Sequence, residues 1–144
     1  MKNLLTYFMP LTMLMLVGCG ASGQDENQPA EESLCTIYIS NNKGWEPLNV
    51  YLKDKENGTE YAGGGNGAEL TDNERINGYV YFYYEVPAAA NNREVGVVCN
   101  NGEGGKTSEI VLKLDKDYYL LLSPNSNTPT IIENLDNPFE SLVP

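Results

Sequence analysis

Short alternating segments between glycine- and asparagine-rich turns constrain this chain most, because such segments form strands rather than helices. In residues 35–40, Cys35, Ile37 and Ile39 point to one side and polar residues to the other. The segment 48–53 alternates in the same way. The part of the chain that follows the N-terminal segment shows no helical pattern longer than one turn. The sequence therefore predicts an all-β domain.

The spacing of these segments indicates the architecture. We expect strands at residues 35–40, 48–53, 59–61, 79–86, 94–100, 107–114, 117–122 and, at an edge, 130–132. Residues 62–68 read as a glycine-rich loop. The strands at 107–114 and 117–122 are expected to form a hairpin around Asp115 and Lys116. Seven or eight strands at this spacing predict a small antiparallel β-sandwich of immunoglobulin-like type.

The N-terminal segment has the pattern of a targeting signal and is not expected to be part of the folded domain. Residues 4–17 form an apolar run interrupted by polar residues and a proline, too short for a membrane-spanning helix. The motif Leu16-Val17-Gly18-Cys19 resembles the lipobox of bacterial lipoproteins. The resemblance implies that residues 1–18 are a signal peptide and that Cys19 carries the lipid.

The segment after Cys19 predicts a location. Residues 19–34 are rich in small, polar and acidic residues, which is typical of a flexible tether. Gly20 stands where an Asp would indicate retention in the inner membrane of Gram-negative bacteria. The acidic residues that follow resemble the surface-export signals of Bacteroidetes lipoproteins. We therefore expect a lipid-anchored protein of the outer membrane that faces outward and touches the membrane only through its lipid.

Composition excludes several function classes. The formal net charge is −11, so phosphate backbones are repelled and nucleic acid is not expected as a partner. The absence of histidine removes the commonest general base and the commonest zinc ligand. The carboxylates of Asp115 and Asp117 are too few for a calcium loop. A sandwich of this size rarely encloses the carboxylate pair of a glycosidase. No cofactor, no metal and no catalytic activity are expected.

A series of short motifs points to one family. In order they are Thr36-Ile37-Tyr38, Gly44-Trp45, Leu48-Asn49-Val50-Tyr51, Gly67-Ala68-Glu69-Leu70, Ile76-Asn77-Gly78, Val86-Pro87, residues 97–102, Lys106-Thr107 and residues 114–119. Together they resemble the starch-binding modules of carbohydrate-binding family 26. The resemblance spans residues 36–122 and implies a carbohydrate-binding β-sandwich at 35–122. Residues 123–144 are then a Pro- and Asn-rich C-terminal tail.

The resemblance also implies a sugar site. The family's platform has an aromatic residue at the position of Tyr51, a second one two residues on, and a Trp-Pro-Gly loop. Here Lys53 takes the second position, and Gly65 and Asn66 stand in place of Trp-Pro. Sugar rings stack on aromatic faces, while amides and amines bond the hydroxyls. The expected carbohydrate-binding residues are Tyr51, Lys53, Tyr61, Asn66, Asn100 and Lys106.

Several residues keep two interpretations. Tyr61 is a replacement for the missing Trp or an ordinary loop residue. Asn100 and Lys106 bond sugar hydroxyls or belong to a plain turn. Trp45 and the aromatic strand at 79–84 serve stacking or packing.

The two remaining cysteines and the function also keep two interpretations. Cys35 and Cys99 form a disulfide, as the oxidising compartment favours, or serve as apolar core residues. The expected function is non-catalytic binding of a starch-like α-glucan near neighbouring glycan-uptake proteins of the cell surface. The alternative is a structural or protein-interaction lipoprotein with a degenerate sugar site.

Overall fold

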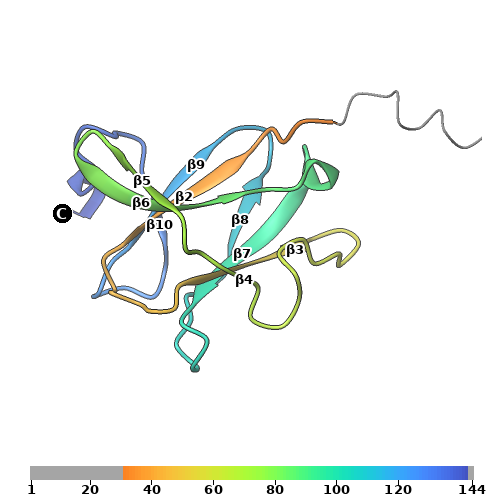
Figure 1. The fold of residues 1–144 in the computed structure, drawn as a ribbon, viewed down its shortest axis with the longest axis horizontal. Coiled ribbons are helices and arrows are strands. Elements are labelled where there is room, and N and C mark those ends of the chain that lie inside the picture. The colour runs from red at the N-terminus through yellow and green to blue at the C-terminus, as the bar shows by residue number, and fades with distance from the viewer. Residues whose placement is uncertain (1–30, 143–144) are drawn as a thin grey trace, which may run out of the picture. The chain divides into compact units, whose positions relative to one another are not determined.

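The computed structural model describes residues 31–142 of the 144-residue chain. The predictions for the signal peptide, for Cys19 and for most of the tether lie outside the described residues. The described part is built from two facing β-sheets (Figure 1). Within it, no helix has the length and apolar character that crossing a membrane requires.

One sheet has five strands and the other has four. The five-stranded sheet has the order β10-β9-β2-β6-β5, with β2 at Thr36–Asn41, β5 at Asn73–Ile76, β6 at Tyr79–Glu85, β9 at Tyr118–Leu122 and β10 at Thr130–Ile131. The four-stranded sheet has the order β4-β3-β7-β8, with β3 at Asn49–Asp54, β4 at Ala68–Glu69, β7 at Glu94–Asn100 and β8 at Ile110–Lys113. Short 3-10 helices cover Ala88–Ala90 and Glu140–Leu142.

The core lies between the two sheets. Alternating residues of both sheets point inward and are buried there, among them Ile37, Ile39, Val50, Leu52, Val95, Val97, Leu112, Leu120 and Leu122. Burial of each large aliphatic side chain contributes about 1.5–3 kcal/mol, so this layer dominates the stability of the domain. The β-sandwich predicted from the alternation of the sequence is confirmed.

The predicted hairpin around Asp115 and Lys116 is wrong. Strand β8 pairs with β7 in the four-stranded sheet, whereas β9 runs parallel to β2 in the five-stranded sheet. The two strands bury Leu112 and Leu120 in the same core from opposite sides. The turn at Asp115 and Lys116 therefore takes the chain from one sheet to the other. Strands β2 and β9 form a parallel pair, whereas the other paired strands are antiparallel. Alternation alone does not distinguish these two routes.

The short strands also differ from expectation. Residues 59–61 form no strand, and within them only Glu60 makes a bridge, to Lys53. Strands β4 and β5 were not predicted, because β4 has only two residues and β5 is polar and mostly exposed. Strand β5 is held by its pairing with β6. Between these strands lie Asn77 and Gly78, both with positive φ, as a tight hairpin requires.

The predicted C-terminal tail is part of the fold. Strand β10 pairs with β9, and the following Ile132 is buried on the outer side of the five-stranded sheet. There it packs with Tyr81, which is fully buried, and with Leu121. The aromatic strand therefore serves packing, one of its two interpretations. Trp45 is likewise partly buried against the main core.

The predicted disulfide between Cys35 and Cys99 is wrong, and the core interpretation holds. Both are free thiols, 1% and 0% exposed, and burial raises the pKa of each to about 12. Cys35 lies near the beginning of β7, because the N–H of the preceding Leu34 donates a hydrogen bond to Asn91, just before that strand. Cys99 lies near the end of β7. The inward faces thus hold the two thiols at opposite ends of the sandwich, on the order of 16 Å apart along a strand.

Candidate functional site

A groove of about 630 Å³ crosses the outer face of the four-stranded sheet. On its floor lie Tyr51 of β3 and Val98 of β7, which are direct cross-strand partners. One wall is the glycine-rich loop at residues 63–67, and the other is the segment that follows β7. The lining residues are Tyr51, Gly65, Asn66, Val98, Asn100, Gly104, Gly105, Lys106, Thr107, Ser108 and Glu109.

Four of the six predicted carbohydrate-binding residues meet in this groove. They are Tyr51, Asn66, Asn100 and Lys106, which come from three separate stretches of the sequence. Lys53 lies on the same face of β3 but does not line the groove, and its side chain extends over the turn at Gly58. Tyr61 is not part of the lining either.

The groove also contains residues that sequence reasoning missed. Val98 is one of them, although the pairing of two alternating strands places it beside Tyr51. Thr107, Ser108 and Glu109 are others, and they lie between β7 and β8 in a stretch without strand structure. A signal existed for Val98 in the alternation of β7, but the sequence carries no such signal for the irregular stretch.

The ring of Tyr51 is anchored at its hydroxyl. That hydroxyl donates a hydrogen bond of 2.7 Å to the Oε2 atom of Glu60, and this bond raises the pKa of Tyr51. Glu60 lies outside β3 and is positioned by a backbone bridge to Lys53, which belongs to the same strand as Tyr51. The ring is thereby held at the surface with a fixed hydroxyl, which suits a stacking platform because little side-chain freedom is left to lose on binding.

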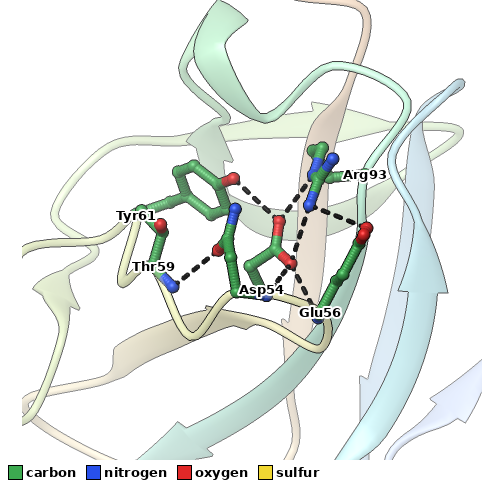
Figure 2. Close-up of polar contacts among 6 residues, drawn as sticks. Asp54, Glu56, Thr59, Tyr61 and Arg93 are labelled. Carbon is green, nitrogen blue, oxygen red and sulfur yellow. Dashed lines mark hydrogen bonds and ion pairs between the residues drawn. The ribbon is translucent and has the colours of Figure 1, made fainter.

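Tyr61 has a structural role instead of the predicted contact with sugar. Its ring is packed against the core, and its hydroxyl donates a 2.9 Å hydrogen bond to the Oδ2 atom of Asp54 (Figure 2). The backbone carbonyl of Tyr61 accepts a hydrogen bond from the hydroxyl of Tyr84. Tyr61 thus lies outside the lining of the groove, and its partly buried ring packs against the core, as expected of an ordinary loop residue.

Asp54 is the centre of this network at the end of β3. Its carboxylate, on a residue only 2% exposed, receives two hydrogen bonds from Arg93, of 2.6 and 3.1 Å. It also accepts the backbone N–H group of Glu56 (Figure 2) and that of Asn57. The bonds from Arg93, above all, hold the pKa of Asp54 well below its usual range. The network fixes the 54–61 segment, which carries Glu60 to the edge of the groove.

In the described part of the chain, the groove has two charged side chains, Glu109 and Lys106, and only Glu109 is in an ion pair. Glu109 lies over Gly96 and forms a 2.8 Å ion pair with Lys55, so its charge is compensated. Among the ion pairs of the described residues, Lys106 takes part in none. The amine of Lys106 is thus a hydrogen-bond donor at the wall of the groove, and it carries a charge opposite to that of the protein as a whole.

This set of groups suits a polyhydroxylated ligand with an apolar face. It offers one anchored ring, one apolar floor residue and several amide, hydroxyl and amine groups around them. Across residues 31–142, no three carboxylates or thiols are grouped as a metal ion would require. The groove can therefore stack one face of a sugar ring and hydrogen-bond its hydroxyls.

Comparisons with known proteins give a distant likeness. No family model matches the sequence, and no curated protein matches it. Among solved structures, the chain is similar to CBMbc (family CBM26) from Eubacterium rectale Amy13K, crystallised in complex with maltoheptaose, with 16% identity and a TM-score of 0.47. The match covers 74% of this chain and 52% of that one, so the chain spans about half the length of that protein. At this distance no residue of the site can be transferred, and the function must rest on the groove itself.

Proposed function

We propose that this domain is a non-catalytic module that binds an α-glucan-like polysaccharide in the groove at Tyr51. The observation that carries the proposal is that four residues chosen from the sequence as sugar contacts line one groove. Their chemistry is complementary to a sugar, because Tyr51 offers a ring face while Asn66 and Lys106 offer hydrogen bonds. The starch-like class of glycan comes from the motifs shared with family 26 modules.

The proposal extends to where the protein acts. The lipobox-like motif that ends at Cys19 supports a lipid anchor, and Gly20 supports the outer membrane. A tethered module that binds glycan would hold polysaccharide close to surface proteins that degrade or import it. The acidic domain would contact the membrane through its lipid alone, since like charges repel it from anionic lipid surfaces.

Retention on insoluble starch tests the proposed binding. We expect the purified protein to co-sediment with starch and the Tyr51→Ala variant to remain in the supernatant. Loss of a stacked ring costs on the order of 1–3 kcal/mol for bases, and a similar loss here would weaken binding about five- to 150-fold. Tyr51→Phe keeps the ring and loses only the bond to Glu60, so most retention should persist.

The control for this experiment is Val111→Ala. Val111 lies on the neighbouring strand β8, is 50% exposed and does not line the groove. Its variant should be retained like the parent. Equal retention of the parent and the Tyr51→Ala variant would exclude the groove as the binding site.

The lipid anchor is tested separately. In cells that process lipoproteins, the parent should fractionate with membranes and incorporate a palmitate analogue. Cys19→Ser removes the thiol that would carry the lipid, so this variant should be soluble and unlabelled. Membrane association of an unlabelled parent, unchanged in the variant, would contradict the lipobox interpretation.

One observation favours a second function. Among residues 31–142, Tyr51 is the only aromatic one that lines the groove, since the hydroxyl of Tyr61 is bonded to Asp54 and its ring packs against the core. A single ring gives a glycan less stacking area than a row of rings would, so a structural or protein-interaction role is the competing candidate. Failure of the parent to bind starch or any other polysaccharide in a panel would favour this candidate.

A further inference from the structure

A cluster of asparagine side chains connects the two walls of the groove. The Nδ2 atom of Asn100 donates a 2.8 Å hydrogen bond to the backbone carbonyl of Asn66 in the glycine-rich loop. Its Oδ1 atom accepts one bond from the Nδ2 atom of Asn49 and another from the backbone N–H of Gly102. Both acceptor positions of the Asn100 amide are therefore in use within the protein.

The base of this cluster is buried and closely packed. Asn49 is the cross-strand partner of Asn100 and is 6% exposed. A Cβ atom on Gly102 would lie 3.2 Å from the Nδ2 atom of Asn49, so the backbone passes directly over the amide. A polar group at this depth needs its partners, because burial of an unpaired amide is unfavourable. The bonds to Asn49 and Gly102 therefore hold the side chain of Asn100 in one position beneath the groove.

Each wall is ordered by its own bonds. In the loop at 63–67, the N–H of Gly67 bonds the carbonyl of Gly64. In the second loop, at residues 101–105, the Oδ1 atom of Asn101 accepts the N–H groups of Glu103 and Gly105. These bonds fix the shape of each loop, and none of them crosses the distance between the loops. The bond from Asn100 to Asn66 spans that distance.

We propose that Asn100 is a positioning residue that sets the width of the groove by linking the loop at 63–67 to the loop at 101–105. This inference rests on the proposed function, because it concerns the same site. It replaces the expectation that Asn100 bonds sugar hydroxyls directly. A groove whose walls are already linked loses less conformational freedom when a chain of sugars enters it.

Two substitutions separate the two halves of the link. Asn100→Ala removes all three bonds and should free both loops. Asn100→Asp keeps the acceptors for Asn49 and Gly102 but replaces the donor to Asn66 with a carboxylate oxygen that repels the carbonyl. This second variant should therefore free the loop at 63–67 and leave the loop at 101–105 in place.

Amide hydrogen exchange and titration with maltoheptaose test the inference on the purified full-length protein. In Asn100→Ala, the amides of both loops should exchange faster while those of β2 and β9 stay unchanged. The Kd for maltoheptaose should rise by about tenfold or more. The control is Asn66→Ala, which keeps the backbone carbonyl that accepts the bond, so its loop amides should exchange as in the parent.

The outcomes separate this inference from the proposed function. Weaker binding by Asn100→Ala with unchanged loop exchange would make Asn100 a direct ligand and overturn the inference. Faster loop exchange with unchanged affinity would overturn it as well, since groove width would then not matter. A parent that binds no maltoheptaose would refute the proposed function, and exchange in the two Asn100 variants would still confirm or refute the link between the loops.

Discussion

The Asp54→Asn variant is expected to unfold more than about 10 °C below the parent protein in a thermal melt at neutral pH. Asp54 is buried, and its carboxylate accepts five hydrogen bonds that tie β3 to the start of β7 and to Tyr61. The asparagine amide has nearly the same size as the carboxylate. Its NH2 group, however, is itself a donor and would face the N–H and O–H donors that the carboxylate oxygen accepts in the parent. Arg93 would then lose its main partner while its side chain stays only 33% exposed.

The same carboxylate predicts a dependence on pH. Its pKa is lowered in the folded protein, so its contribution to stability is fully present above the unfolded pKa of about 3.9. As the pH falls below about 4, the unfolded state binds a proton first and the contribution is progressively lost. The difference in Tm between parent and Asp54→Asn should therefore be constant near neutrality and shrink on acidification below about pH 4.

Glu56→Gln is the matched control. Glu56 also contacts Arg93, at 3.2 Å, but its side chain is 82% exposed. Solvent-exposed ion pairs contribute little, so the Tm of this variant should lie within a few degrees of the parent value. Equal losses in the two variants, or none in Asp54→Asn, would contradict the role assigned to the buried carboxylate.

Substitution of Gly67 is expected to have the second large effect. Gly67 has a φ of 87°, and a Cβ atom there would lie 2.1 Å from the backbone oxygen of Val50 and 2.9 Å from the Cα atom of Tyr51. Backbone atoms cannot move aside easily, so Gly67→Ala should destabilise the protein by about 3 kcal/mol in urea denaturation. Since the displaced backbone carries Tyr51, binding of starch should weaken as well.

Gly65→Ala separates the clash from the backbone conformation. Gly65 has a φ of 62°, but no atom lies within 4 Å of the position a Cβ atom would take. Only the left-handed conformation is then penalised, which costs about 1 kcal/mol. If both variants lose the same free energy of unfolding, the close approach of Gly67 to β3 is not what fixes the loop.

The sequence predicted the parts of the fold that local pattern controls. The inward faces of β2, β3 and β7 follow from alternation, and Ile37, Val50 and Val97 are buried as expected. The hairpin at Asp115 failed because alternation records which face is apolar but not which sheet a strand joins. The disulfide failed for a related reason, since an inward side chain can lie at either end of the sandwich.

Tyr51 was predicted because the resemblance to family 26 modules implies a platform aromatic at its position. The alternation of its strand agrees with that prediction, since it turns this side chain outward. Glu60 and Tyr61 are adjacent in sequence, yet one reaches Tyr51 at the surface and the other reaches Asp54 inside. That choice depends on Arg93, which is distant in sequence and completes the buried network. No local pattern contains this information.

Titration of the 15N-labelled protein with maltoheptaose, followed by amide chemical shifts, tests the central claim most directly. Binding in the groove should shift the amides of Tyr51, Asn66, Val98 and Lys106, and the shifts should be absent in Tyr51→Ala. Tyr38 and Tyr119 stack on each other on the outer face of the five-stranded sheet, beside Tyr81 and Ile132. Shifts confined to that face, or no shifts at millimolar ligand, would contradict the assignment of this groove as a glycan-binding site.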